Sequence, residues 1–258
     1  MSVQITRRLK PEEEELLRKR SELDAIKVTL AERELELADL SSHLAAFEGR
    51  YLRQVGALYA ELDEWKARIA ELRAQRDPST AARRQSEEAR EQARQTHEAA
   101  HGEASKPPDF TPSPELKSLF REVAKNIHPD FAKDSADRDL RTRLMAEANR
   151  AYRAGDADAL RRILAEYDNS ADAIPGEGVG AELIRIIRQI SQARERVASI
   201  ERELATLRQS EIAQLAQDDE KAKQEGRDLL AELAADVRER IQLAMQEHGV
   251  LVEEVGRS

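Results

Sequence analysis

The sequence predicts an all-α protein in which two long coiled-coil helices, paired as an antiparallel hairpin, flank a small helical domain. Apolar residues recur at every seventh position near both ends of the chain, which is the repeat of helices that pack along their length. Shorter amphipathic patterns of helical period lie between the two repeats. Of the 258 residues, 36% are charged and only 3% are aromatic. This composition is typical of extended helices and excludes a large globular core.

Residues 1–76 are predicted to form the first coiled-coil helix. Apolar companions follow the heptad series by three positions in the first half, where Lys19 and Arg33 interrupt them, and by four positions in the second half. Two consecutive four-residue steps, from Phe47 to Tyr51 and from Tyr51 to Val55, predict a stutter that relaxes the supercoil locally. The series itself consists of Leu9, Leu16, Leu23, Leu30, Leu37, Leu44, Tyr51, Leu58, Trp65 and Leu72.

Residues 181–250 are predicted to form the second coiled-coil helix, of about the same length. Its apolar series is regular at first, falters between residues 211 and 226, and then resumes. Equal lengths on either side of a small insert favour an antiparallel intrachain hairpin, with the insert near the turn. The alternative is a parallel homodimer, because heptads alone do not determine orientation. The members of the series are Leu183, Ile186, Ile190, Ala193, Val197, Ile200, Leu204 and Leu207, followed by Leu230, Leu233, Val237, Ile241 and Met245.

Two linkers connect these parts. Residues 77–112 form a charged and Pro-rich linker, whose first part lacks an apolar stripe and is expected to be a solvated single helix or disordered. The prolines that follow indicate a semi-rigid spacer. Phe110 in this spacer either folds back onto the small domain or remains a loose aromatic side chain. Residues 169–180 form a second, Gly/Pro linker.

Residues 113–168 are predicted to form a compact unit of three short helices. The first two apolar stripes end at Ile127 and Tyr152, and Gly155 supplies the helix-ending glycine. Asp156 is a suitable N-cap for the third helix. The stripes comprise Leu116, Leu119, Phe120, Val123 and Ile127; Leu140, Leu144, Met145, Ala148, Ala151 and Tyr152; and Ala159, Leu160, Ile163, Leu164 and Tyr167.

The tripeptide His128-Pro129-Asp130 lies between the first two of these helices. Pro129 takes the residue before it out of the helical region, and Asp130 can cap or pair with nearby donors. A tripeptide alone is most simply a helix-ending turn with a capping aspartate. With matching helices on both sides, we interpret it as a protein-contact loop.

The segment from Ser113 to Tyr167 resembles a J-domain, the co-chaperone module named after DnaJ. The residues that carry the resemblance are the LFREVAKNIHPD stretch, Leu119 to Asp130, and the AEANRAY stretch, Ala146 to Tyr152. The resemblance covers roughly a fifth of the chain. Where a J-domain begins with a further helix, this chain has four prolines between Lys106 and Pro114, so that helix is missing. Glu122, Asn126 and Phe131 also stand where the family often has basic residues.

The resemblance implies that this loop and the basic helix before it contact a DnaK-type heat-shock ATPase and stimulate ATP hydrolysis. The chaperone-binding residues would be the triad His128, Pro129 and Asp130, together with the basic residues Lys117, Arg121 and Lys125. In this co-chaperone interpretation, the coiled coils bind a client or scaffold protein or mediate homodimerisation. The alternative is a coiled-coil structural or adaptor protein whose J-like unit is inactive on the ATPase.

Composition and motifs argue against other function classes. An enzyme is not expected, and neither is a cofactor, because the chain has no cysteine, no Gly-rich loop and no histidine near His128 to build a site. His97 and His101 are four residues apart but lack a third metal ligand. The net charge of -9 argues against nucleic-acid binding. No run approaches the length of a membrane span, and we expect a cytoplasmic protein.

Overall fold

The computed structural model describes residues 10–77, 79–101, 110–170 and 178–255. All regular secondary structure in these ranges is helical, which confirms the predicted all-α class. The chain divides into two compact units. Unit 1 comprises residues 1–43 and 110–209, and unit 2 comprises residues 44–109 and 210–258.

A single long helix contributes to both units. It starts as α1 (Pro11–Tyr51), passes through one π-helical turn, η1 (Leu52–Gly56), and continues as α2 (Ala57–Arg76). The π turn lies in the stretch where the heptad spacing predicts a stutter. Before it, the buried residues belong to the leucine series, as Leu23 and Leu30 do; after it, they are Leu62 and Ile69, which follow that series by four positions. An irregular turn at this point lets the apolar face continue in a new register.

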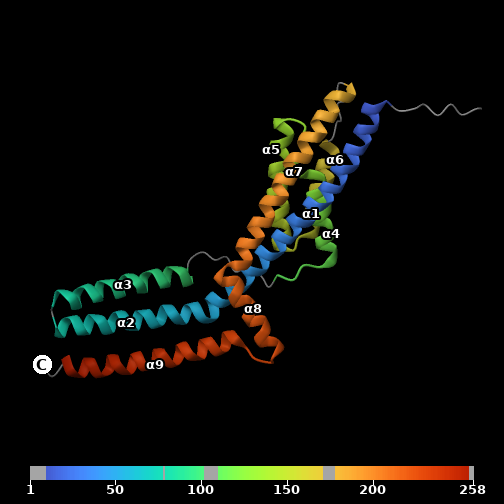
Figure 1. Ribbon diagram of the computed structural model, residues 1–258. Helices are drawn as coiled ribbons and strands as arrows, with labels where there is room; N and C mark the ends of the chain where they lie inside the picture. The colour runs from blue at the N-terminus through green and yellow to red at the C-terminus, as the bar shows by residue number, and fades with distance from the viewer. Residues whose placement is uncertain (1–9, 78, 102–109, 171–177, 256–258) are drawn as a thin grey trace, which may run out of the picture. The chain divides into compact units, whose positions relative to one another are not determined.

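In unit 1, α1 packs in parallel against α7 (Gly178–Gln209) through an apolar seam that includes Leu23, Leu30 and Ile190. Ion pairs along the seam join residues whose numbers rise together: Arg20 with Glu182, Glu22 with Arg194, and Glu36 with Arg208. Figure 1 shows the two helices side by side with the same chain direction. The predicted antiparallel hairpin is therefore wrong, and the pairing observed is parallel within one chain.

Three short helices of unit 1 form the small domain that the apolar stripes predict. They are α4 (Pro114–Ile127), α5 (Ser135–Ala154) and α6 (Ala157–Ser170), with the 3-10 turn η2 (Pro129–Phe131) after α4. Ser113 caps α4, Asp156 caps α6, and Gly155 ends α5 with a φ of 71°. Phe120, Leu144, Tyr152 and Leu160 are among the fully buried side chains of its core.

Helix α1 closes the open face of this small domain. Ala31, Leu35 and Ala38 of α1 belong to the same apolar cluster as the cores of α4, α5 and α6. Phe110 folds back onto the cluster, with its ring 5.4 Å from that of Tyr152, so the loose-aromatic alternative is wrong. Residues of α1 and Phe110 therefore complete the core of the small domain. Pro107 and Pro108 lie outside the described residues.

In unit 2, α2 lies between two helices (Figure 1). It packs in parallel against α9 (Leu229–Val255), with ion pairs from Arg73 to Glu247 and from Arg76 to Glu254. It packs antiparallel against α3 (Thr80–His101), as the contact of Arg90 with Glu71 indicates. The core of this unit consists of Phe47, Val55, Leu62, Ile69, Leu230, Ala234, Val237, Ile241 and Ala244.

Helix α3 overturns the expectation that residues 77–105 form a solvated or disordered linker. Its inner face is a heptad of small residues, in which Ser86 and Ala93 are buried. Small side chains allow two helices to approach closely, and Cα atoms of α2 and α3 lie within 8 Å of each other. The sequence prediction missed this stripe because it considered large apolar residues only. The stripe consists of Ala82, Ser86, Ala89, Ala93, Thr96 and Ala100.

The C-terminal segment is not one helix over residues 181–250, as predicted, but three. Helix α7 ends at Gln209, where Ser210 leaves the helical region and caps α8 (Glu211–Gln224). Gly226, with a φ of 75°, ends α8, and Asp228 caps α9. Both breaks fall in or beside the stretch where the apolar series falters. Most of the Gly/Pro linker, residues 171–177, lies outside the described residues.

Candidate functional site

The candidate site is the loop that follows α4 in unit 1. Helix α4 ends at Ile127 because Pro129 requires an extended residue before it, and His128 has a φ of −58° and a ψ of 133°. The backbone N–H of Phe131 donates to the carbonyl of His128 at 3.1 Å, which closes η2. The tripeptide thus forms a rigid turn, as predicted.

The side chain of His128 is buried against α1, with only 3% of the residue exposed. Its Nδ1 accepts a hydrogen bond from the backbone N–H of Asp130 at 3.2 Å, so the ring proton belongs on Nε2. Nε2 lies 3.2 Å from Oε1 of Glu34 on α1 and donates to that carboxylate. The predicted contact residue is therefore engaged within the chain.

Glu34 connects the loop to α7 as well. The same Oε1 accepts from Nε of Arg196 at 2.9 Å, and Arg196 also binds Glu203 at 2.9 Å. Burial opposes ionisation of Glu34, but the hydrogen bonds from His128 and Arg196 and the Arg196 charge outweigh it and hold the pKa of Glu34 below its usual value. Glu34 is thus a buried carboxylate of α1 whose charge is satisfied by α7 and the loop.

A second buried ion holds the loop from the other side. Arg141 of α5 is 4% exposed and donates through Nη1 to the carbonyls of Asn126 and His128, at 3.0 and 3.2 Å. Its Nε donates to Asp137 at 2.9 Å, and its Nη2 donates to the hydroxyl of Tyr167. Arg141 therefore satisfies carbonyls at the end of α4 that the helix leaves unpaired.

The basic residue Lys117 is also engaged with α1. Its Nζ lies 2.6 Å from Oδ2 of Asp39, while the hydroxyl of Tyr152 donates to Oδ1 of the same carboxylate at 2.7 Å. Burial of the Tyr152 hydroxyl and its bond to Asp39 raise the pKa of that tyrosine well above its usual range. Asp39 therefore ties α4 and α5 to the same helix that holds His128.

The remaining predicted residues face solvent to a greater degree. Arg121 and Lys125 are exposed on α4, and Pro129 and Asp130 are half-buried. Burial raises the pKa of Asp130, although the charges of His128 and Arg196 oppose it. The structure thus separates the six predicted site residues into two that contact α1, His128 and Lys117, and four that do not bond to it.

Sequence reasoning missed the charged residues that hold the loop and the helices around it: Glu34, Asp39, Arg141 and Arg196. Glu34 and Asp39 are carboxylates beside a leucine seam, where charged residues are common and carry no particular signal. Arg141 had a weak signal, because it follows Leu140 on the inner side of a predicted amphipathic helix. The pairings of Glu34 and Asp39 depend on α1 lying on the small domain, whereas those of Arg141 lie within that domain.

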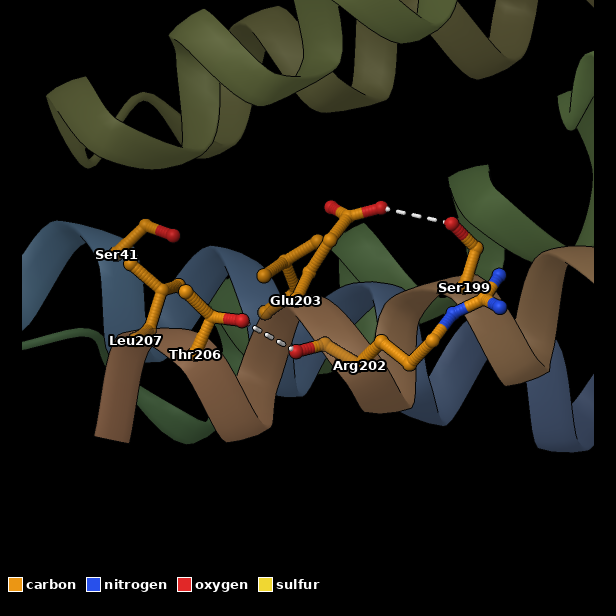
Figure 2. Close-up of a pocket in the computed structure, with 7 residues that line it drawn as sticks. Ser41, Ser199, Arg202, Glu203, Thr206 and Leu207 are labelled. Atoms are coloured by element: carbon orange, nitrogen blue, oxygen red, sulfur yellow. Dashed lines mark hydrogen bonds between the residues drawn. The ribbon is translucent and has the colours of Figure 1, made fainter. Parts of the chain in front are cut away.

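A shallow cavity of about 540 Å³ lies on the other side of the α1–α7 seam, between Ser41 and Leu207. In Figure 2, the hydroxyl of Ser199 bonds to Glu203, and that of Thr206 bonds to the carbonyl of Arg202. Both hydroxyls are occupied by bonds within their own helix. Among the described residues there is also no cluster of side chains suited to hold a metal ion.

Comparisons with protein-family models, with curated proteins and with solved structures find no match to this chain. The resemblance of residues 113–167 to a J-domain accordingly rests on the residues alone. No helix in the described ranges has the length and apolar character needed to cross a membrane.

Proposed function

We propose that the protein is a helical adaptor, in which the J-like unit is a structural part of the α1–α7 pair and does not stimulate a DnaK-type ATPase. In this proposal α1, α7, α2 and α9 act as parallel coiled-coil pairs that present binding surfaces to partner proteins. The observation that carries it is the burial of His128 against Glu34, since a loop whose histidine is bonded inside the chain cannot offer that side chain to a partner.

The contacts around the loop support this proposal. An ATPase that used His128 and Lys117 would have to displace Glu34 and Asp39, both of which accept two hydrogen bonds. A hydrogen bond to a buried charged group contributes about 1.5–3 kcal/mol, and a partly exposed pair such as Lys117 with Asp39 contributes less than about 1 kcal/mol. Loss of the apolar contacts of Ala31 and Leu35 would add to that cost. The free energy with which an ATPase binds this loop would be weakened by the cost of breaking all of these contacts.

A second candidate function is a co-chaperone that is latent until the J-like unit leaves α1. The exposure of Arg121 and Lys125, and the partial exposure of Asp130, favour it, because part of the predicted contact face stays accessible. In this case the α1 contacts would act as an intramolecular inhibitor.

A single-turnover ATPase assay with a DnaK-type chaperone tests both candidates. The proteins are wild type, the double variant Glu34→Gln with Asp39→Asn, and this double variant combined with His128→Gln. The control is Glu36→Gln, which removes a carboxylate from the exposed side of the same helix. The adaptor proposal expects no stimulation by any of them, with helical content unchanged by circular dichroism.

Stimulation by the double variant alone, lost again with His128→Gln, would replace the adaptor by the latent co-chaperone. Stimulation by the wild type that disappears with His128→Gln would show that the loop is available in spite of its contacts. Either result overturns the adaptor proposal.

A further inference from the structure

A cavity of about 550 Å³ in unit 1 gathers positive charge in a chain that is acidic overall. It lies between α1, the end of α4, the loop after the triad, and α7. Two carboxylates, Asp24 and Glu182, line it. The six cationic side chains that line it are Arg20, Lys27, Lys125, Lys133, Arg141 and Arg185.

Only part of this charge is neutralised by the protein itself. Arg20 is paired with Glu182, and Arg141 with Asp137. The other four cations, Lys27, Lys125, Lys133 and Arg185, form no ion pair with any residue that the structure describes. Surface cations in this protein are commonly paired along or between helices, as Lys66 is with Asp63 and Lys221 with Asp218. Other cations, such as Arg53, Arg150 and Arg238, also lack an ion pair among the described residues, so the distinguishing feature is that four such cations line one cavity.

Lys27 shows the electrostatic consequence. It lies on α1 with its Nζ 5.2 Å from the centre of the Phe131 ring, at the wall next to the triad. Burial lowers the pKa of Lys27, Asp24 opposes this effect, and the nearby charges of Arg141 and Lys125 add to it. The cluster thus stores mutual repulsion that a bound anion would relieve.

The size and charge of the cavity indicate the class of anion. Its volume is within the range of small-molecule sites and exceeds what a single tetrahedral anion fills. Lysine ammonium groups bind phosphate oxygens as point charges, so three lysines with one arginine match several negative charges held close together. We propose that the cavity binds a small polyanion with two or more linked phosphate groups, supplied as free pyrophosphate or as the phosphates of a nucleoside diphosphate.

An acidic peptide fits this arrangement less well. Its carboxylates carry one charge each, and along an extended chain those on the same side lie about 6–7 Å apart. The four unpaired cations instead all line one cavity. Linked phosphates place two to four charges within that space.

Isothermal titration calorimetry on the full chain at low ionic strength tests the proposal. The ligands are sodium pyrophosphate, ADP, orthophosphate and a poly-glutamate peptide, each at matched ionic strength. We expect pyrophosphate to bind at least about tenfold more tightly than orthophosphate. Tighter binding of ADP than of pyrophosphate would identify a nucleotide as the source of the phosphates, and the reverse order would identify the free anion.

The variant Lys27→Gln with Lys125→Gln should weaken pyrophosphate binding at least about tenfold, because two of the four unpaired charges are lost. The matched control, Lys66→Gln with Lys221→Gln, removes two paired lysines of unit 2 and should leave binding unchanged. Absence of pyrophosphate binding, equal weakening in both double variants, or tighter binding of poly-glutamate than of pyrophosphate would each overturn the proposal. Thermal unfolding of the free variants shows whether they remain folded, and Lys27→Gln alone serves if the double variant does not.

Discussion

Replacing Glu34 with glutamine keeps the size of a buried side chain but removes the charge that His128 and Arg196 share. The carboxylate accepts from these residues at 3.2 and 2.9 Å, and Glu34 is 6% exposed. Hydrogen bonds to charged groups contribute about 1.5–3 kcal/mol each. Glutamine retains one carbonyl, and Arg196 keeps its bond to Glu203, so we expect the free energy of unfolding to fall by about 2–3 kcal/mol.

The matched control is Glu36→Gln, two residues along the same helix. Glu36 is also bonded to two arginines, Arg33 and Arg208, but its side chain is 34% exposed. Exposed pairs contribute less than about 1 kcal/mol, because water and salt screen them. Urea unfolding followed by circular dichroism measures both variants, and the fluorescence of Trp65 follows unit 2 separately. Equal losses in the two variants, or a loss below about 0.5 kcal/mol for Glu34→Gln, would refute the reasoning.

The difference in unfolding free energy between wild type and Glu34→Gln should depend on pH, with a sign that follows from the pKa of Glu34. The pKa of Glu34 in the folded protein is below its ordinary value of 4.5, so the folded state holds the proton less tightly than the unfolded state. The stabilisation that the Glu34 carboxylate contributes is complete when the pH is above the ordinary pKa of a glutamate, and it is lost as the pH falls through the pKa of Glu34 in the folded protein. The difference between wild type and Glu34→Gln should therefore be constant from pH 7 to about pH 5.5 and should shrink below pH 4.5. A difference that grows on acidification would contradict this assignment.

Five further substitutions test the packing. Ala93→Leu should cost about 1–3 kcal/mol by overfilling the α2–α3 contact, whereas Ala99→Leu on the exposed face of α3 should have little effect on urea unfolding. Gly155→Ala should destabilise the protein by about 1 kcal/mol, because Gly155 has a φ of 71°. Gly249 lies in α9, and no atom lies within 4 Å of a Cβ added there. Gly249→Ala should therefore stabilise the protein by about 0.5–1 kcal/mol in thermal unfolding. Tyr152→Phe removes a bond to Asp39 and should cost about 1 kcal/mol; an unchanged midpoint would show that this bond contributes nothing.

The sequence was sufficient for the elements of the small domain and insufficient for its surroundings. Large apolar residues at helical spacing, with Ser113, Asp156 and Gly155 as terminators, predict α4, α5 and α6 correctly. These signals are local, because caps and amphipathic stripes depend on residues within a few turns. The stutter between Phe47 and Val55 likewise coincides with the π turn.

The direction of helix pairing had no comparable local signal. A leucine seam is equally apolar in both orientations, so α1 and α7 could be assigned only by equating the insert with a turn. That argument failed because α3 packs antiparallel against α2 and so already reverses the chain direction before the small domain. The stripe of α3 that makes this contact consists of small residues rather than large apolar ones. The burial of His128 depends in turn on that pairing, since Glu34 and Arg196 are separated by 162 residues in the sequence.

The parallel pairing has a consequence for how the chain folds during synthesis. The ion pairs of α1 with α7 and of α2 with α9 join residues 162 to 178 positions apart. Between α2 and α3, the ion pair of Arg90 with Glu71 spans 19 positions and the hydrogen bond of Thr96 to Asp63 spans 33. The α2–α3 hairpin can close as soon as it leaves the ribosome, because short loops cost less entropy to form. The leucine seam of α1, however, stays without its partner until α7 has been made. At about 5–20 residues per second, that interval lasts on the order of 10 seconds, and throughout it the nascent chain exposes an apolar stripe that other proteins can bind.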